Sequence, residues 1–388
     1  MHPLGKKTIA SYQNHLPRRV CFGRGQLDHI VDRCKELDRS RVFVVSDTGV
    51  EAAGLLDVTL ERLAESGLLC GSFAQIAPEP PIEQVDQLAS LLKESKSDLV
   101  IAIGGGSVMD ATKVAGVLAK HSGSARDYVG IGKVPSRGIA SILIPTTSGT
   151  GSEATFVAIL TDKSTGNKAG VVSPHLLADV AIVDPSLTDR LPVQITAATG
   201  MDAMVHALEA LIAKCSTPLA RGLALQSAGN IGWALEAVVQ DPSNLRARDA
   251  MSLGSHLAGM SFANSSCCGV HALALPLGGR YPIPHGVITG TFFSEVMRLN
   301  ASACAEEFGD FSVALGWGNL STAEFCNRIE ILAQSIGLFD QLHRFTIDAD
   351  SIQDMAKDAC ANRRLMDPNP VAISEQAAQA IYRKLLKV

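Results

Sequence analysis

Residues 98–113, DLVIAIGGGSVMDATK, decide the fold. The segment 98–106 is an apolar run, typical of a buried strand, that ends in the glycines Gly104, Gly105 and Gly106. Helix-forming residues follow at once, over 107–120. Strands of this kind are typical of parallel sheets that helices cover on both faces. The stretch therefore predicts one strand–turn–helix unit of an α/β domain.

The same alternation of strands and helices continues along the first half of the chain. Strand candidates are RVFVVSD (41–47), GSFAQIA (71–77), ASILIP (140–145) and DVAIVDP (179–185). Residues 50–66 and PIEQVDQLASLLKES (81–95) have the pattern of helices. This order predicts a parallel sheet with helices on both faces.

The composition changes near Leu191-Pro192, beyond which long Ala/Leu/Met-rich segments dominate. We therefore predict two domains, an α/β nucleotide-binding domain over 1–192 and an all-α domain over 193–388. A cleft between two domains is the usual place for a ligand.

The glycine turn at 104–106 has a functional and a structural interpretation. Gly105 and Gly106 let a diphosphate approach the backbone, and the amides at the start of the following helix would bind its oxygens. Ser107 and Asp110 have the spacing of an N-terminal cap for that helix. Glycine turns after strands also serve packing alone, and both interpretations stay open.

A second loop, PTTSGTGSE (145–153), follows another apolar strand. The hydroxyls of Thr146, Thr147 and Thr150 are suited to phosphate or ribose, so two such loops favour a dinucleotide. Asp47 ends the strand 41–47, where an acid accepts hydrogen bonds from adenosine ribose and repels a 2′-phosphate, favouring NAD over NADP. The alternative is that Asp47 only caps the next helix.

Asp202, His206, His271 and His285 form the candidate metal site. Asp202 and His206 lie four apart in GMDAMVHALEA, a helix-favouring segment that would place both on one face. His271 and His285 lie in VHALALPLGGRYPIPHG, where two glycines and two prolines allow the chain to turn back between them. One carboxylate and three imidazoles suit Fe(II) or Zn(II). The alternative for the helical pair is a surface hydrogen bond.

Composition limits the partners and the location. The net charge is −5 and no basic cluster stands out, which argues against nucleic acid. No apolar run reaches the length of a membrane span, and the N-terminus has no apolar signal core, so we predict a cytoplasmic protein. The 9 cysteines are scattered and odd in number, which indicates reduced thiols. We interpret the adjacent Cys267 and Cys268 as small apolar packing residues.

With these residues in view, the chain resembles the iron-containing (group III) alcohol dehydrogenase family. The matching motifs, in the family's order, are GGGSVMDATK, PTTSGTGSEAT, DPSLT, ATGMDAMVHALEA and HALALPLGGRYPIPHG. The resemblance implies a dehydroquinate synthase-like architecture with NAD(P) and a metal ion in the cleft, and commonly a homodimer. Members oxidise small alcohols or reduce aldehydes.

The resemblance also implies residue roles. The metal ligands fall on Asp202, His206, His271 and His285. The cofactor contacts fall on Asp47, Gly105, Gly106, Ser107, Asp110, Thr146, Thr147, Thr150, Lys168 and Leu187. Lys168 would bond nicotinamide ribose, and Leu187 would pack near the cofactor.

Three positions depart from the family pattern. Leu275 stands where a histidine often relays the alcohol proton, so the proton path must differ. Glu79 stands where asparagine is usual near the cofactor, and a carboxylate cannot donate as an amide does. Arg280 replaces a frequent aromatic residue. We hypothesise that Arg280 contacts an anionic group on the substrate, with Arg363 and Arg364 adding to the patch; the alternative is a salt bridge.

The sequence therefore predicts a metal-dependent, NAD(H)-linked alcohol dehydrogenase or aldehyde reductase without further catalytic side chains beyond the metal ligands. Two alternatives remain. One is a metal-independent maleylacetate-type reductase of the same superfamily, which the complete set of ligand types disfavours. The other is a catalytically silent nucleotide-binding protein.

Overall fold

The computed structural model describes residues 11–164 and 166–387, which fall into two compact units. Residues 15–191 form an α/β unit, whereas residues 11–14 and 192–387 form a helical unit. The predicted combination of a parallel-sheet domain and a helical domain is confirmed.

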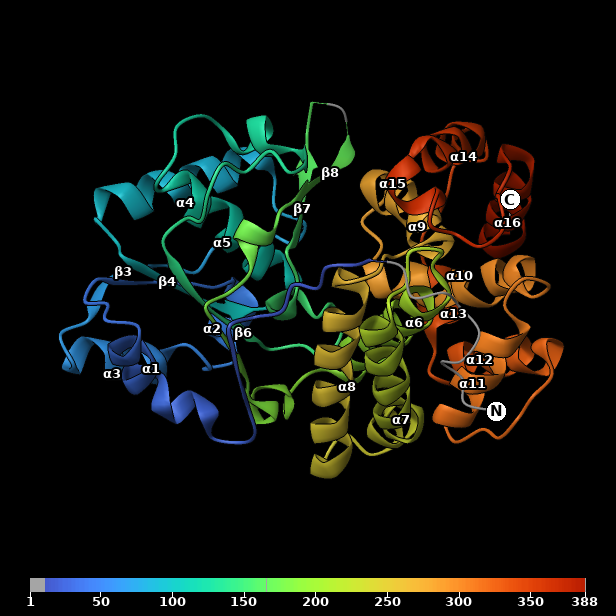
Figure 1. The fold of residues 1–388 in the computed structure, drawn as a ribbon, viewed down its shortest axis with the longest axis horizontal. Helices are drawn as coiled ribbons and strands as arrows, with labels where there is room; N and C mark the ends of the chain where they lie inside the picture. The colour runs from blue at the N-terminus through green and yellow to red at the C-terminus, as the bar shows by residue number, and fades with distance from the viewer. Residues whose placement is uncertain (1–10, 165, 388) are drawn as a thin grey trace. The chain divides into compact units, whose positions relative to one another are not determined.

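The α/β unit is built on a six-stranded sheet in the order β1-β9-β6-β4-β2-β3 (Figure 1). Every strand pair in this sheet is parallel. The strands are β1 (Arg19–Phe22), β2 (Val42–Val45), β3 (Leu69–Phe73), β4 (Leu99–Gly104), β6 (Ala140–Pro145) and β9 (Val180–Val183). Because all strands run the same way, the loops that follow them gather at one edge of the sheet.

Apolar side chains cover both faces of this sheet, as the continuous apolar strands predict. On one face Ile101 and Ile142 pack with α1 (Ile30–Glu36) and α3 (Asp57–Glu65). On the other face Val100 and Leu143 pack with α4 (Ile82–Glu94) and α5 (Gly106–Leu118). The helices lie on opposite sides of the sheet in Figure 1, which gives three layers. Central strands are buried on both faces, so they tolerate no polar side chain without a partner.

Parts of the α/β unit differ from the sequence prediction. The single helix expected over 50–66 is two helices, α2 (Thr48–Ala52) and α3, separated at Gly54, whose φ of 70° is incompatible with a continuing helix. The strand expected over 71–77 ends at Phe73. A second, three-stranded sheet was not predicted at all; it consists of β5 (Gly130–Ile131), β7 (Val157–Asp162) and β8 (Asn167–Val172), with β7 and β8 antiparallel.

The helical unit surrounds α6 (Val193–Ile212), which packs against α7 (Pro218–Gln240), α8 (Leu245–Ala263) and α10 (His285–Asn300). The remaining helices are α9 (Gly269–Arg280), α11 (Ala305–Ala314), α12 (Thr322–Ser335), α13 (Leu338–Leu342), α14 (Ser351–Ala361), α15 (Arg363–Met366) and α16 (Glu375–Leu386). By length and composition α6 is apolar enough to cross a membrane, but nearly all of it is buried in the core of this unit. Its apolar length is thus explained by packing.

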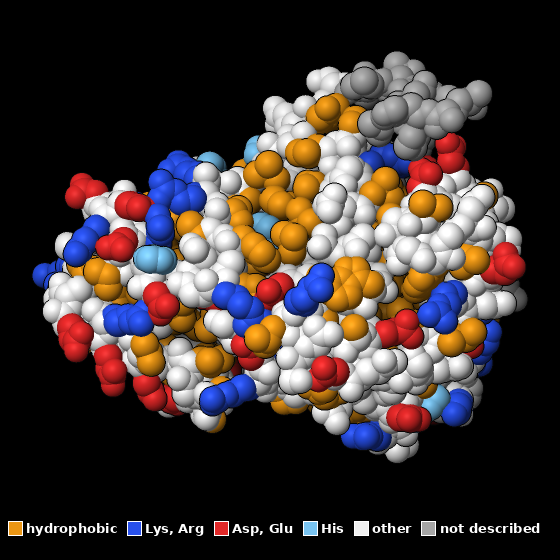
Figure 2. Space-filling view, turned by 90° about the horizontal axis from the view of Figure 1, so that it is seen from below, with side chains coloured by type: hydrophobic (Ala, Val, Ile, Leu, Met, Phe, Trp, Pro, Cys, Tyr) orange, Lys and Arg blue, Asp and Glu red, His pale blue; other side chains and the backbone are white. Residues whose placement is uncertain are grey.

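Charged side chains of both signs are interspersed over the surface face drawn in Figure 2. Among the described residues on that face, basic side chains do not gather into one large patch. This distribution agrees with the balanced composition and does not favour a polyanion as partner.

Candidate nucleotide loops and metal centre

The sheet brings most of the predicted cofactor residues to one edge. β9, β6, β4 and β2 are neighbours, and their carboxyl ends lead respectively to Leu187, to the Thr146–Thr150 loop, to Gly105–Ser107 and to Asp47. Gly104 stands beside Pro145 in the sheet register, and the Thr146 amide donates to the Gly104 carbonyl at 3.1 Å. The two glycine-containing loops are therefore adjacent, as a dinucleotide site requires.

The close approach at Gly106 explains why a glycine is needed there. A Cβ atom added to Gly106 would lie 2.8 Å from Thr150 Cγ2. The N-cap of α5 is Gly105, which offers no side-chain cap. The amides of the first turn of α5 are thus not satisfied by a capping side chain, and a diphosphate fits this helix start in size and charge.

The predicted cap by Ser107 is wrong. α5 begins at Gly106, so Ser107 and Asp110 lie inside the helix. Ser107 Oγ accepts a hydrogen bond from the Glu79 amide at 3.0 Å. The Asp110 carboxylate accepts from the Ile159 amide at 2.8 Å and from the Ser152 hydroxyl at 2.5 Å. These polar side chains tie α5 to Glu79, to the 3₁₀ turn at Ser152 and to β7 rather than starting the helix.

Asp47, Leu187 and Lys168 have structural partners in this unit. Asp47 caps α2: its Oδ1 accepts from the amides of Gly49 and Val50 at 2.8 and 2.9 Å. Leu187 is buried in the short 3₁₀ segment Pro185–Thr188. The capping alternative is thus realised at Asp47, while its second oxygen, Oδ2, is not used in the cap.

Lys168 pairs with Glu79, the residue that replaces the family's usual asparagine. Lys168 Nζ forms an ion pair with Glu79 Oε2 and donates to Thr161 Oγ1 at 3.1 Å. Burial lowers the pKa of Lys168, and the Glu79 carboxylate opposes this shift. Glu79 has a left-handed backbone with φ 53°. Glu79 therefore fixes the position of the Lys168 ammonium group, while its own backbone amide donates to Ser107.

The helix α6 carries the first two predicted metal ligands on one face. Asp202 and His206 are both buried, and Asp202 Oδ2 lies 3.7 Å from His206 Nδ1. The Thr289 hydroxyl of α10 donates to Asp202 Oδ1 at 2.8 Å. Phe262 stacks on the His206 ring, with centroids 4.4 Å apart. Packing and one hydrogen bond thus fix the carboxylate and the imidazole in place.

His271 and His285 come from two further helices. His271 lies in the first turn of α9, and His285 is the first residue of α10. The predicted turn between them lies at 281–284, where Pro282 and Pro284 stand, but Gly278 and Gly279 do not take part in it, because they continue α9. Helices tolerate glycine at modest cost, whereas Pro284 ends the turn as the N-cap of α10.

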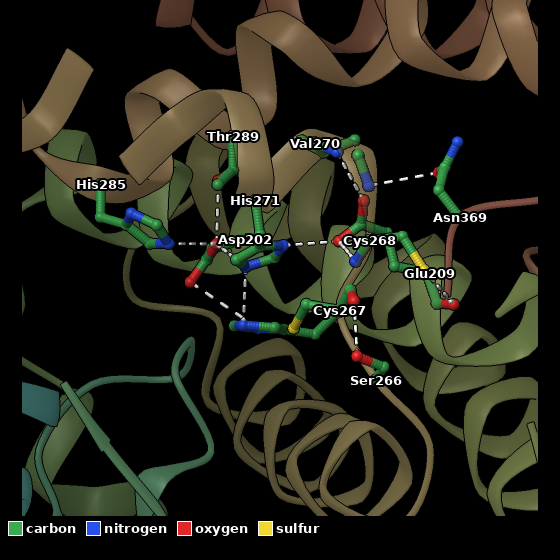
Figure 3. A network of polar contacts seen from close by, with 12 residues as sticks. Asp202, Glu209, Ser266, Cys267, Cys268, Val270, His271, His285, Thr289 and Asn369 are labelled. Carbon is green, nitrogen blue, oxygen red and sulfur yellow. Dashed lines mark hydrogen bonds and ion pairs between the residues drawn. The ribbon is translucent and has the colours of Figure 1, made fainter. Parts of the chain in front are cut away.

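The structure brings the four predicted ligands into one cluster (Figure 3). His271 Nε2 lies 3.0 Å from His206 Nε2 and 3.7 Å from Asp202 Oδ1. His285 Nε2 lies 3.8 Å from the same Asp202 oxygen. Two atoms that each bind one ion at about 2.1 Å lie at most about 4.2 Å apart. Each of these pairs meets that limit. Asp202, His271 and His285 each offer one donor atom within 4.8 Å of the other two, so these three fit a divalent cation, and His206 joins them through its contact with His271.

Glu209 supports this cluster and was not identified from the sequence. Its carboxylate accepts from His271 Nδ1 at 2.6 Å and from the amides of Cys268 and Val270 at 2.8 and 2.7 Å. The Nδ1 bond directs His271 Nε2 toward the other ligands. Glu209 follows His206 by three residues and Asp202 by seven, so one helix face carries all three. Thr289 similarly follows His285 by four.

The electrostatics of the cluster favour a cation. Burial raises the pKa of Asp202, but His206, His285 and His271 outweigh burial and bring it below its usual value. Burial lowers the pKa of His271, but Cys267 and Glu209 outweigh burial and raise it well above its usual value. The cluster therefore holds a buried carboxylate and attracts positive charge to the imidazole nitrogens.

Other positions singled out from the sequence have partners outside this cluster. Arg280, at the end of α9, donates to Asp358 Oδ2 at 2.6 Å and to the Pro276 carbonyl at 3.2 Å. This is the salt bridge that the alternative interpretation predicted. Leu275, one turn after His271, is half-buried and packs against the core. Arg363 pairs with Asp367.

Two family models match nearly the whole chain. The model described as iron-containing alcohol dehydrogenase matches residues 17–185, and the one described as Fe-containing alcohol dehydrogenase family, C-terminal, matches residues 196–386. The chain belongs to the iron-containing alcohol dehydrogenase family. It is therefore an oxidoreductase of the alcohol dehydrogenase class, and the resemblance noted from the motifs is confirmed.

Individual members of the family agree with this assignment. The chain is 38% identical to long-chain-alcohol dehydrogenase 1 of Geobacillus thermodenitrificans over 93% of each chain. A crystal structure of 1,3-propanediol oxidoreductase superposes with a TM-score of 0.90 at 32% identity, covering 97% of this chain and 100% of that one. Sulfoacetaldehyde reductase from Bifidobacterium kashiwanohense, solved with NAD⁺, has a TM-score of 0.89 at 29% identity, covering 98% and 100%.

Proposed function

We propose that this dehydrogenase is metal-dependent and NAD(H)-linked, and interconverts a small alcohol and its aldehyde. The observation that carries the proposal is the cluster of one carboxylate and three imidazoles, whose donor atoms lie 3.0 to 3.8 Å from one another along the chain of contacts. When bound there, Fe(II) or Zn(II) supplies Lewis acidity to the substrate oxygen, while the nicotinamide carries the hydride.

The side chains of the cluster have distinct tasks in this proposal. Asp202, His206, His271 and His285 bind the cation. Glu209 accepts the Nδ1 proton of His271 and so keeps the Nε2 lone pair directed at the ion. Thr289 holds the Asp202 carboxylate by donating to Oδ1. Asp202, His206, His271 and Thr289 are buried, which strengthens their interactions with charge, whereas the His285 side chain is 35% exposed.

The α/β unit supports binding of the dinucleotide. We propose that its contacts are Asp47, Gly105, Gly106, Ser107, Asp110, Thr146, Thr147, Thr150, Lys168 and Leu187. The amides at the start of α5 would bind the diphosphate, and Asp47 Oδ2 would accept from the ribose, which favours NAD over NADP. Sulfoacetaldehyde reductase, similar over nearly the full chain, was solved with NAD⁺, which supports the same choice.

The proton path must differ from that of family members with a histidine one turn after the third ligand. Leu275 occupies this position, and its side chain neither accepts nor donates a proton. We propose that the alcohol proton leaves through water or the cofactor ribose. We also propose that the protein is cytoplasmic, and that it is a homodimer, as the family resemblance implies; light scattering of the purified protein measures its mass.

The decisive experiment combines chelation with a substrate panel. The protein stripped of metal is reloaded with Fe(II) or Zn(II), and turnover of NADH and NADPH is followed with neutral and anionic short-chain aldehydes. We expect activity to vanish on stripping, to return with metal, and to prefer NADH. Activity that survives stripping would instead support the maleylacetate-type alternative. Bound metal and NADH without turnover of any aldehyde would support the silent protein.

A further inference from the structure

Cys267 lies beside the metal ligands, although its sequence suggested packing alone. Its Sγ and one nitrogen each of His206 and His271 all lie within 4.8 Å of one another. All three side chains are buried. Figure 3 shows Cys267 in the same cluster as His271. The distances are close to what one ion requires, because a thiolate and an imidazole on Zn(II) lie at most about 4.4 Å apart.

The backbone around Cys267 is anchored on both sides, so this placement is not accidental. The Ser265 hydroxyl donates to the Ala210 carbonyl of α6 at 2.8 Å, and the Ser266 hydroxyl donates to the Cys267 carbonyl at 2.7 Å. The next amide, of Cys268, is held by Glu209 Oε2 at 2.8 Å. The segment thus cannot move away from α6 without breaking the Ser265–Ala210 and Cys268–Glu209 bonds.

We propose that Cys267 is an additional metal ligand, which with His206 and His271 forms a softer donor set overlapping the set of Asp202, His271 and His285. The inference rests on the proposed metal centre and adds a residue to it. On binding, the Cys267 thiol loses its proton to solvent and its sulfur bonds to the divalent ion, so charge and atoms balance. Thiolate favours Zn(II), whereas carboxylate and imidazole alone also suit Fe(II). Cys267 therefore biases this dehydrogenase toward zinc.

Cobalt(II) reports this ligand directly, without reference to activity. The full-length protein is stripped of metal, loaded with Co(II), and its absorption recorded. We expect a sulfur-to-cobalt charge-transfer band in the near ultraviolet that Cys267→Ser loses. Cys268→Ser is the matched control: its sulfur is also buried and lies 3.8 Å from the Glu209 carbonyl oxygen, so the band should remain. In Asp202→Asn the band should also remain, although Co(II) binds more weakly.

Affinity gives the second measurement. In competition with a chromophoric chelator, Cys267→Ser should weaken Zn(II) binding by about tenfold or more, while Fe(II) binding changes less. Circular dichroism establishes that each variant is folded. Ligand-field absorption of Co(II) without a charge-transfer band in the unmutated protein would overturn the role of Cys267 but keep the proposed metal centre. A failure to bind Co(II) at all would overturn both.

Discussion

The candidate sites of the two units are built from different groups: backbone in the α/β unit and side chains in the helical unit. In the α/β unit the nucleotide loops depend on the backbone: a Cβ at Gly106 would lie 2.8 Å from Thr150 Cγ2, and the proposed diphosphate donors are backbone amides. In the helical unit the metal cluster depends on side chains from α6, α9 and α10 that are up to 83 residues apart, from Asp202 to His285. Each nucleotide loop is local in sequence, although the sheet brings the loops together, whereas the metal cluster exists only after the helices pack.

This difference has an energetic consequence. A backbone site survives most side-chain replacements but is sensitive to any added bulk at the glycines. A side-chain cluster is sensitive to each donor and to the residues that orient it, since a buried polar group that loses its partner costs about 1–3 kcal/mol. Variants that affect one unit and spare the other therefore test the comparison.

Replacement of a ligand should have the largest effect. Asp202→Ala removes the carboxylate that lies 3.7 Å from His271 Nε2 and 3.8 Å from His285 Nε2. We expect kcat/KM to fall at least about a thousandfold, the loss of roughly 4 kcal/mol of transition-state stabilisation. Metal content and steady-state kinetics check this. The affinity for NADH, measured by fluorescence, should hardly change. A parallel loss of NADH binding would contradict the view that the two sites are independent.

Glu209→Gln should have the next largest effect, because Glu209 orients a ligand without binding the ion. A glutamine presents an NH₂ group to one of its present donors, the amides of Cys268 and Val270 or the Nδ1–H of His271. We expect metal affinity to fall about 10–100-fold. Chelator competition measures it. Equal affinities of the variant and the unmutated protein would mean that His271 is oriented by packing alone.

Gly106→Ala addresses the other unit. Its Cβ would lie 2.8 Å from Thr150 Cγ2, so the two loops must separate. We expect the Kd of NADH to rise about tenfold, equivalent to about 1.4 kcal/mol, with metal affinity unchanged. Thr150→Ser removes the clashing methyl but keeps the hydroxyl, so Gly106→Ala with Thr150→Ser should recover much of the affinity. If the affinity for NADH did not recover, the loss would come from a change at the α5 amides rather than from the clash with Thr150.

The same difference explains what could be predicted from sequence. The strands and the two glycine loops were predictable because period, apolar runs and glycine are local signals. The start of α5 was not predictable. Ser107 and Asp110 have the spacing of a helix cap, but in the fold their side chains bond instead to Glu79, Ser152 and Ile159, which are distant in sequence. The β7–β8 hairpin was missed because its polar turn region resembles a loop.

The ligand set was proposed from spacing and family motifs, but its supporting residues were not. Glu209 and Thr289 lie one helical turn from His206 and His285, and this spacing was visible in the sequence. What sequence could not show is which face of α6 meets α9 and α10. Cys267 illustrates the same limit: buried cysteines usually pack as small apolar residues, and only the fold places this sulfur near two imidazoles.

The smallest effects should come from the arginines that were candidates for an anionic substrate. Arg280 is engaged by Asp358 at 2.6 Å, so Arg280→Gln should change KM by less than about threefold, and equally for acidic and neutral aldehydes. Arg364 differs: it is half-buried on α15, which packs against α9, and burial lowers its pKa. The positive charge of Arg364 opposes the rise that burial causes in the pKa of Cys267, which lies beside the proposed metal ligands.

An anionic group on the substrate would therefore be expected near Arg364 rather than Arg280. Arg364→Gln should raise KM for acidic aldehydes by about tenfold and leave neutral ones nearly unchanged, because only the acidic substrates lose a charge partner of about 1.4 kcal/mol. Arg363→Gln is the control, since Arg363 is exposed and paired with Asp367. If all three variants turned over acidic aldehydes with the KM of the unmutated protein, the helical unit would recognise no charge on the substrate.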